Sequence, residues 1–318
     1  MKSNLDSYIE KLRTIFKEND YRLAHQKSRE ILVGMAQDEQ VLFEIIKRNL
    51  SSTRFFSKKR INPVIAFDVT QNKDFSIIAH CWMPLPDRST NITHQSIHHH
   101  GRLLLTSVSP FGNDGYESAI FKKDWQLDKE EGVANMKVEK IYHNNKHNIE
   151  FVDSFTPHVV FYPKDFSITY AMWSYDKKDG VLATLRQSKF VQRNKKNIGA
   201  VLQKLGLSKK VGINVLEYFD FFPDGEKIQA MQNRVMYPEG SNENFVQNVF
   251  YILQKVGFND KQFIRDLKNS MTKEEIEVAE KPMQQFLDDA PIKDVFDPVH
   301  LNIPKINFSK EQLLRSVH

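Results

Sequence analysis

The sequence predicts a mainly β protein, an antiparallel β-barrel or sandwich of the jelly-roll type with helices before and after it. Between residues 61 and 193 the chain breaks into short segments rich in β-branched and aromatic residues. Turn-forming residues separate these segments, and no stretch between them has the helical spacing that a parallel α/β sheet would need. On both sides of this region the helical spacing of apolar residues returns.

Residues 1–60 are predicted to form helices that pack on the barrel. Apolar residues recur every three or four positions from Leu5 to Phe16, and Ser3 or Asn4 is a suitable N-cap. A second helical stretch is expected from about Gln26 to Leu50.

Residues 61–193 carry the candidate strands of the barrel. They begin with VIAFDV, FSIIAHCWM, HQSIHHH, RLLLTSV and YESAIFKK and continue with MKVEKIYH, IEFVDSF, HVVFYP, FSITYAMWSY and VLATLRQSKFV. Residues 71–74 and 162–165 have the composition of turns. Consecutive strands are therefore expected to run antiparallel.

Residues 194–318 are predicted to form a helical C-terminal region. The helical spacing occurs in NKKNIGAVLQKLGL, in GEKIQAMQNRVM and from Phe245 to Val256, and Thr272 with Glu275 matches a capping box. Amphipathic helices bury their apolar stripe against something. The sequence leaves open whether these helices cover the barrel or join two chains in a homodimer.

Composition and charge exclude several classes of protein. Lys and Arg total 45 against 40 Asp and Glu, a net charge of +5, but the basic residues form scattered pairs, so no nucleic-acid partner is expected. Cys81 is the only cysteine, which favours a reducing compartment. No signal peptide and no apolar run of about 18 residues occurs. We therefore expect a cytoplasmic protein without a membrane partner.

Histidines gather at one point of the sequence. His98, His99 and His100 follow one another directly before the apolar segment that starts at Arg102. Side chains at positions i and i+2 of a strand share a face. His98 and His100 are therefore expected to project together as metal ligands, and His99 to the opposite side.

A mononuclear metal site needs a third ligand from another strand. His158 opens the segment HVVFYP and is the best candidate. His143 and His147 lie in a polar stretch that is typical of a turn, whereas His80 and His94 are reserve candidates. The alternative that these histidines are exposed or structural stays open.

With these segments the chain resembles the cupins of the cysteine dioxygenase (thiol dioxygenase) type. KDFSIIAHCWMPL is similar to that family's strand entering a Trp-x-Pro turn, and SIHHHGR is similar to its Ile-His-x-His-Gly signature. TPHVVFYPKDFSITYAMWSY is similar to its His-x-Val/Ile-x-Asn strand, followed by a turn and a strand ending in tyrosine. The resemblance extends from about Asn72 to Tyr175.

The resemblance implies a cupin-type barrel with a mononuclear Fe(II) centre. His98 and His100 match the family's first two iron ligands, His158 matches the third, and Tyr175 matches the tyrosine beside the iron. The implied partners are a small-molecule substrate and O2. In this interpretation Tyr175 is catalytic and hydrogen-bonds the bound oxygen or the substrate.

The chain departs from the family's pattern at several positions. Ala171 and Trp173 stand where the family has Ser-x-His before the tyrosine, so its proton-relay pair is missing. Asn72 lies near the position of the family's substrate-binding arginine, and Arg88 and Arg102 are candidate substitutes. The glutamate that many other cupins place after the second histidine is absent, which leaves three neutral ligands.

Three neutral imidazoles leave a divalent metal its full charge and open coordination positions, which suits an anionic substrate together with O2. Imidazole ligands also permit Zn, Cu or Ni, and the resemblance favours Fe(II). The sequence therefore predicts a non-haem iron dioxygenase or oxygenase that oxidises a small anionic or thiol-bearing metabolite bound to the metal. Two alternatives stay open, a non-catalytic cupin that binds a metal or ligand and a zinc-dependent isomerase or hydrolase.

Overall fold

The computed structural model describes residues 3–53, 55–57, 64–84, 91–92, 98–112, 115–123, 126–128, 133–136, 138–145, 148–176, 217–224, 227–233, 242–295 and 308–309. It describes the backbone alone at 91–92, 98–99, 126–128, 133–136, 217–224, 227–233 and 308–309.

Four helices precede the first strand: α1 (Asn4–Glu18), α2 (Tyr21–Lys27), α3 (Arg29–Gln37) and α4 (Glu39–Leu50). The Ser3 side chain accepts a hydrogen bond from the backbone N–H of Asp6, which confirms Ser3 as the N-cap of α1. The predicted stretch from 26 to 50 is interrupted at Asp38, which instead caps the first turn of α4.

The strands form two large sheets in which every pair is antiparallel. The first has the order β1 (Val64–Gln71), β2 (Ser76–Trp82), β12 (Ser167–Tyr175), β5 (Arg102–Ser109) and β10 (Ile149–Val152). The second has the order β7 (Gln126–Asp128), β8 (Val133–Met136), β14 (Lys227–Asn233), β13 (Glu217–Asp224), β4 (His98–His99), β11 (His158–Phe161), β6 (Tyr116–Phe121) and β9 (Val138–Asn144). A separate pair joins β3 (Asn91–Ile92) to β15 (Phe308–Ser309).

The strand order identifies the fold as a jelly roll. Each large sheet contains four strands in a mixed order along the chain. These are β2-β12-β5-β10 in one sheet and β4-β11-β6-β9 in the other. If these eight strands are numbered in chain order, the two sheets read 1-8-3-6 and 2-7-4-5, which is the double Greek key of a jelly roll. The predicted mainly β, cupin-type barrel with helices before and after it is confirmed.

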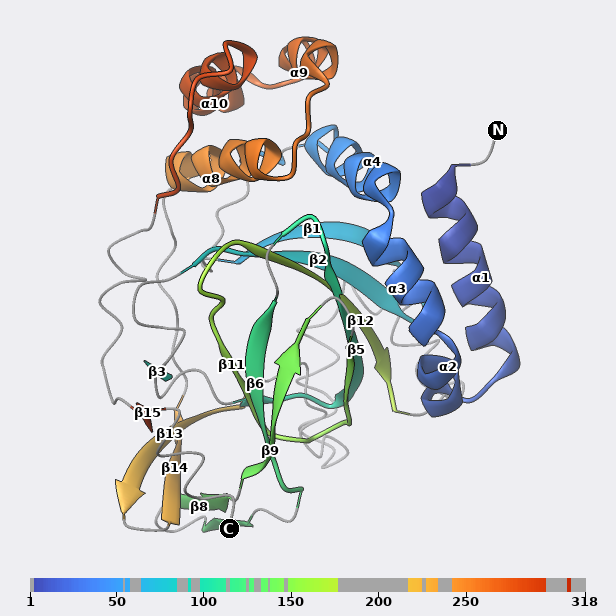
Figure 1. Ribbon diagram of the computed structural model, residues 1–318, viewed down its shortest axis with the longest axis vertical. Coiled ribbons are helices and arrows are strands. Elements are labelled where there is room, and N and C mark those ends of the chain that lie inside the picture. Colours follow the sequence, from blue (N-terminus) through green and yellow to red (C-terminus); the bar gives the residue numbers. More distant parts are fainter. Residues whose placement is uncertain are drawn as a thin grey trace, which may run out of the picture.

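Among the described residues of the C-terminal region, one predicted element differs from the structure. The segment GEKIQAMQNRVM, predicted as a helix, contains strand β14, so this prediction is wrong. β13 and β14 lie side by side and pair with each other (Figure 1), and β13 also pairs with β4. The aromatic run EYFDFF followed by Asp224-Gly225 is a hairpin signal that outweighs the helical spacing. Part of the predicted helical region thus extends a barrel sheet.

The C-terminal helices α8 (Asn242–Lys255), α9 (Lys261–Lys268) and α10 (Lys273–Leu287) lie beside the β1 side of the barrel (Figure 1). The ring of Phe245 on α8 lies 5.7 Å from that of Phe55, which in turn stacks on Phe67 of β1. Thr272 and Glu275 form the predicted capping box of α10. Among the helices in the described ranges, none combines the length and hydropathy that a bilayer crossing demands.

The two faces of the first sheet have different surroundings. Leu103, Leu105 and Met172 join the large apolar core that includes the helices. The inner face instead carries a small apolar layer of Leu104, Ile120, Val152 and Ala171, against which Trp173 packs. The site that the histidines form lies at one end of this inner layer.

A buried polar cluster lies on the other side of this apolar layer. Asn144 donates to Glu150 at 3.0 Å and to Ser118 at 3.1 Å, and it accepts a bond from Thr106. Burial raises the pKa of Glu150 to about 7, although the bonds from Asn144 and Ser118 and the charge of Lys140 oppose the shift. Glu150 therefore holds a proton in the folded chain at pH values where an exposed glutamate is ionised.

We expect Glu150→Gln to remove a pH-dependent cost to stability. The folded-state pKa is raised above its ordinary value of 4.5, so the free energy of unfolding of the wild type falls as pH rises from about 4.5 to about 7. The variant should gain stability over the wild type across this range, by at most roughly 3 kcal/mol above pH 7. Urea unfolding at several pH values measures the difference. Glu139→Gln, at an exposed position of β9, should keep the wild-type slope, and equal slopes in the wild type and Glu150→Gln would contradict the assignment.

Candidate functional site

Two of the predicted metal ligands meet inside one end of the barrel. His100 precedes β5 and His158 begins β11, and their ring centroids lie 5.0 Å apart with the ring planes at 75°. Both residues are buried, with 9% of the surface of His100 and 4% of that of His158 exposed. Residues 58 positions apart in the sequence thus form an imidazole pair on the inner face of the barrel.

Each ring of the imidazole pair is oriented by a backbone carbonyl. Nδ1 of His100 lies 2.7 Å from the carbonyl oxygen of Arg102, and Nδ1 of His158 lies 2.9 Å from that of Thr156. Because a carbonyl oxygen only accepts, both Nδ1 atoms carry the hydrogen. In the neutral rings the lone pair is therefore on Nε2, as in metal-binding histidines whose other nitrogen is held by a carbonyl.

His98 lies directly opposite His158 in the register of β4 and β11, but only its backbone is described. On the other side of β4, His98 lies opposite Tyr218 and His99 opposite Glu217. Among the described side chains, no three His, Cys, Asp or Glu residues gather as a metal site. The three-histidine set therefore remains a prediction, of which the structure brings two members together.

The imidazole pair fits a transition-metal ion in its spacing and in its donor atoms. Two rings bound through Nε2 at about 2.1 Å each, with roughly a right angle or slightly more between the bonds, have centroids about 5 Å apart. The observed separation of 5.0 Å agrees with this value. Neutral imidazole is a ligand that iron and zinc both accept.

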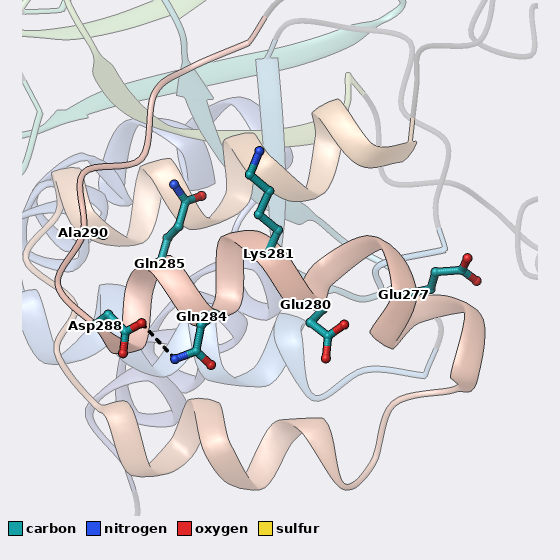
Figure 2. Close-up of a pocket in the computed structure, with 7 residues that line it drawn as sticks. All are labelled: Glu277, Glu280, Lys281, Gln284, Gln285, Asp288 and Ala290. Atoms are coloured by element: carbon teal, nitrogen blue, oxygen red, sulfur yellow. Dashed lines mark hydrogen bonds between the residues drawn. The ribbon is translucent and has the colours of Figure 1, made fainter.

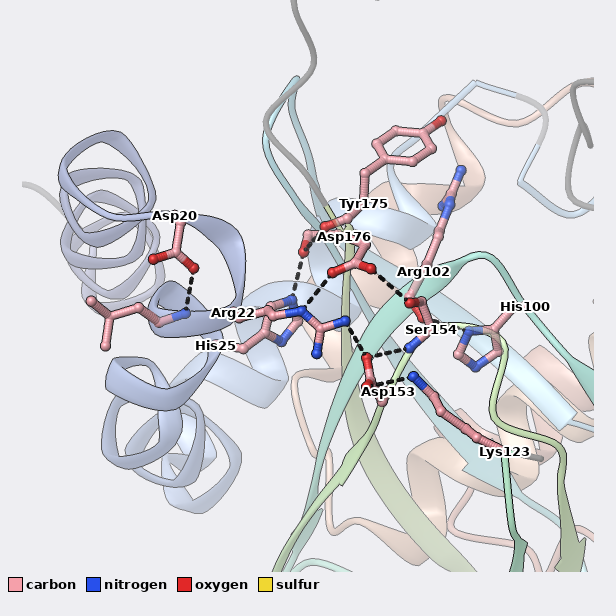
Figure 3. A network of polar contacts seen from close by, with 12 residues as sticks. Asp20, Arg22, His25, His100, Arg102, Lys123, Asp153, Ser154, Tyr175 and Asp176 are labelled. Carbon is pink, nitrogen blue, oxygen red and sulfur yellow. Dashed lines mark hydrogen bonds and ion pairs between the residues drawn. The ribbon is translucent and has the colours of Figure 1, made fainter.

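The indole ring of Trp173 packs against His100. Its centroid lies 4.5 Å from that of His100, at 75° between the planes. Tyr175, the predicted catalytic residue, lies two positions further along β12, directly opposite Arg102 of β5. The Arg102 guanidinium lies 5.1 Å from the centre of the Tyr175 ring, and Figure 3 shows both side chains extending away from His100. Tyr175 and Arg102 therefore form a cationic and aromatic pair at the barrel mouth.

The other histidines that the sequence analysis considered lie elsewhere. His80 is on β2 and lies opposite Thr169, and burial lowers its pKa to about 4. The prediction of a turn at His143 is wrong, since His143 lies in β9 opposite Glu117. Residues His94, His147 and Arg88 lie outside the described ranges.

A short turn, Asp153–Thr156, contacts both members of the imidazole pair. The backbone N–H of Phe155 donates to the carbonyl of His100 at 2.7 Å, and the carbonyl of Thr156 accepts from His158. Phe155 has a φ of 59°, in the left-handed region that costs a residue with a side chain about 1 kcal/mol or more. Phe155 is 58% exposed, an unusually high value for a phenylalanine. Residues 153–155 fall in the predicted strand IEFVDSF, and this part of the prediction is wrong, because β10 ends at Val152.

A surface hollow on α10 offers a different chemistry. Its lining consists of Glu277, Glu280, Lys281, Gln284, Gln285, Asp288 and Ala290, as Figure 2 shows. Five of these residues lie on α10, Asp288 is its C-cap and Ala290 follows it, and the lining includes no imidazole. The imidazole pair in the barrel therefore remains the candidate functional site.

No family model matches the sequence, and no curated protein does either. Similar solved structures include an RmlC-like cupin from Shewanella frigidimarina, at 12% identity and a TM-score of 0.23, over 36% of this chain and 80% of that one. An oxalate decarboxylase from Lactobacillus farciminis has 14% identity and a TM-score of 0.24, over 49% of this chain and 44% of its own. A DMSP lyase from Ruegeria pomeroyi has 9% identity and a TM-score of 0.23, over 39% and 56%. At such low TM-scores these likenesses add no argument, and the fold assignment depends on the strand order described above.

The left-handed conformation of Phe155 leads to a prediction about stability. We expect Phe155→Gly to be more stable than Phe155→Ala by about 1 kcal/mol, because only glycine adopts this φ without strain. Both variants lose the contact between the ring and Gly101, so the comparison isolates the backbone. Urea denaturation of the two variants measures the difference. Equal stability, or a more stable alanine variant, would show that the turn is unstrained.

Proposed function

We propose that this protein is a mononuclear non-haem Fe(II) oxygenase that uses O2 to oxidise a small anionic or thiol-bearing metabolite. The observation that carries the proposal is the imidazole pair of His100 and His158, with both Nδ1 atoms bound to carbonyls and a ring separation suited to one ion. His98 is proposed as the third ligand. The register supports this, because residues directly opposite in an antiparallel pair share a face and His98 lies opposite His158.

When bound between these histidines, iron would supply the electrons and the open coordination positions that a reaction between a bound anion and O2 requires. The chain's own contribution is ligation, orientation and exclusion of water. Trp173 and the apolar layer of Leu104 and Val152 close the inner side of the site. The substrate is therefore expected to approach from the mouth, where Arg102 and Tyr175 lie.

Arg102 is proposed to bind an anionic group of the substrate distant from the metal-bound donor, since its side chain extends away from His100 (Figure 3). Its Nε atom is buried and has no hydrogen-bond partner among the described residues, while its carbonyl is the acceptor that orients His100. Tyr175 holds the guanidinium against its ring face and offers a phenol O–H to the substrate. A buried cationic donor without a partner is costly, so a bound carboxylate would satisfy it with a charge-assisted bond.

Replacement of single histidines tests the proposed ligand set. After an anaerobic Fe(II) reload, the wild type should retain about one iron per chain, and His98→Ala, His100→Ala and His158→Ala should each reduce retained iron at least tenfold, since each removes one of three proposed ligands. His99→Ala is the matched control and should retain most of the iron, because neighbouring strand positions face opposite sides. Metal analysis of desalted protein gives the result, and equal losses at all four positions would overturn the ligand set.

Oxygen uptake separates the proposed oxygenase from its alternatives. The iron-loaded wild type should consume O2 in the presence of at least one member of a panel of small thiols and chelating acids. Bound zinc without O2 consumption would support a zinc-dependent isomerase or hydrolase. Protein without stoichiometric metal would support a non-catalytic cupin.

Substrate charge provides a test of Arg102. We expect Arg102→Met to raise the KM for 3-mercaptopropionate about tenfold or more, because the variant keeps an unbranched apolar side chain and loses the guanidinium that makes the charge-assisted bond. The uncharged 2-mercaptoethanol, used at matched concentrations, should show little change. Oxygen-electrode kinetics with iron content measured in parallel give both values. An equal effect on both thiols would contradict an anion-binding role.

A further inference from the structure

Arg22 on helix α2 joins two segments of the barrel mouth that are far apart in the sequence. Its Nη2 lies 2.8 Å from Asp153 and its Nε lies 2.7 Å from Asp176. Figure 3 shows the guanidinium between the two carboxylates, with α2 on one side and the ends of β10 and β12 on the other. A planar guanidinium with several fixed donors is suited to hold two carboxylates at once.

The two carboxylates bound to Arg22 belong to a larger network of hydrogen bonds. Asp153 also accepts from Lys123 at 2.6 Å and from the backbone N–H of Ser154 at 2.8 Å, and Asp176 accepts from the hydroxyl of Ser154 at 3.0 Å. Burial opposes the ionisation of Asp153, but its bonds to Arg22, Lys123 and Ser154 lower its pKa to about 2. The network thus stays ionised at neutral pH.

Asp153 begins the turn that contacts the imidazole pair. Its carbonyl accepts the N–H of Thr156 at 3.2 Å, which closes the turn around the left-handed Phe155. From this turn, the N–H of Phe155 holds the backbone of His100 and the carbonyl of Thr156 holds the ring of His158. A strained conformation of this kind persists only where its surroundings hold it. The bonds from Arg22 and Lys123 to Asp153 supply that hold.

The other carboxylate, Asp176, directly follows Tyr175. One residue before Tyr175, the Ser174 hydroxyl donates to the Tyr175 carbonyl at 3.0 Å and lies 2.7 Å from Nε2 of His25 on α2. Because the Ser174 hydroxyl has a single hydrogen, His25 donates to Ser174 and is held in its Nε2–H tautomer. Helix α2 therefore fixes the end of β12 twice, through the buried His25 and through Arg22.

We infer that Arg22 is a positioning residue for the candidate metal site, which it supports by holding the Asp153–Thr156 turn against the end of β12. This inference rests on the proposed function for its catalytic meaning, but its structural content is independent of the metal. Arg22 touches neither histidine and acts through Asp153, Phe155 and Thr156. Replacement of Arg22 should therefore leave both histidines present but make the orientation of their imidazole rings less well fixed.

Exchange of the imidazole hydrogens tests the inference without metal. In full-length metal-free protein labelled with 15N-histidine, the Nδ1–H groups of His100 and His158 are assigned with single His→Gln variants. We expect Arg22→Ala to increase their exchange rates with water at least tenfold, because the carbonyl of Thr156 and the backbone of His100 are no longer held. Arg22→Lys keeps the positive charge but lacks the planar set of N–H donors of a guanidinium, so the imidazole hydrogens should exchange at an intermediate rate.

Arg48→Ala is the matched control. Arg48 is also on an N-terminal helix, has a side chain 43% exposed against 47% for Arg22, and bonds two carboxylates, Asp6 and Glu44. It should leave the exchange of both imidazole hydrogens unchanged. Unchanged exchange in Arg22→Ala, or an equal increase in Arg48→Ala, would overturn the inference.

Binding of Co(II) distinguishes failure of the inference from failure of the proposed function. If the proposed function holds, the wild type binds Co(II). Arg22→Ala should then weaken Co(II) binding about tenfold, which is the effect expected of residues that orient metal ligands. The visible absorption spectrum of the bound Co(II) should also change. Wild-type protein that binds no Co(II), together with faster exchange in Arg22→Ala, would reject the function and support the positioning role. Co(II) binding that depends on His100 and His158 but not on Arg22, with unchanged exchange, would reject the positioning role alone.

Discussion

The site depends on the hydrogen bonds that two backbone carbonyls accept from Nδ1 of His100 and His158. Each carbonyl lies two residues from its histidine, at Arg102 and at Thr156, so the backbone of the strand ends sets the tautomer and the orientation of each ring. A buried imidazole without such a partner has no fixed donor atom to offer. Any contact that holds these two backbone segments therefore also determines which imidazole nitrogen faces a ligand. For this reason the Asp153–Thr156 turn matters to the site, although none of its residues is a proposed metal ligand.

In the described part of the jelly roll, an apolar layer of the barrel interior lies next to the imidazole pair. Helices cover the outer face of the first sheet through Leu103 and Leu105, while the inner face carries Leu104, Val152 and Trp173 next to the imidazoles. This apolar layer lies between the imidazole pair and the buried Glu150, whose pKa is near neutral because burial penalises its charge. Uncharged side chains thus separate the carboxyl group of Glu150 from the imidazole pair.

The sequence predicts those features that depend on local spacing. Alternation along the strands and turn residues predict the barrel. The shared orientation of His98 and His100 at positions i and i+2 stays a prediction, and its premise of one shared strand is not met, because β4 ends at His99 and β5 of the other sheet begins at Arg102. The proximity of His100 and His158 follows from the resemblance and from the fold. The β13–β14 hairpin was missed because the helical spacing of the apolar residues in β14 competes with the turn signal before it. The network around Arg22 is not predictable from one sequence, because its partners at 153 and 176 become neighbours only when α2 packs on the closed barrel.

The replacement of the expected relay residue by Trp173 affects where protons and charge can enter the site. In the resemblance, the residue two positions before the tyrosine passes protons, and here that position carries an indole in contact with His100. A route through the barrel interior would then have to cross the apolar layer of Leu104, Ile120 and Ala171. The Tyr175 and Arg102 pair lies at the end of β12 and the start of β5 and offers a phenol and a guanidinium. Under the proposed function these two groups bind the substrate, which favours a substrate that brings its own ionisable group.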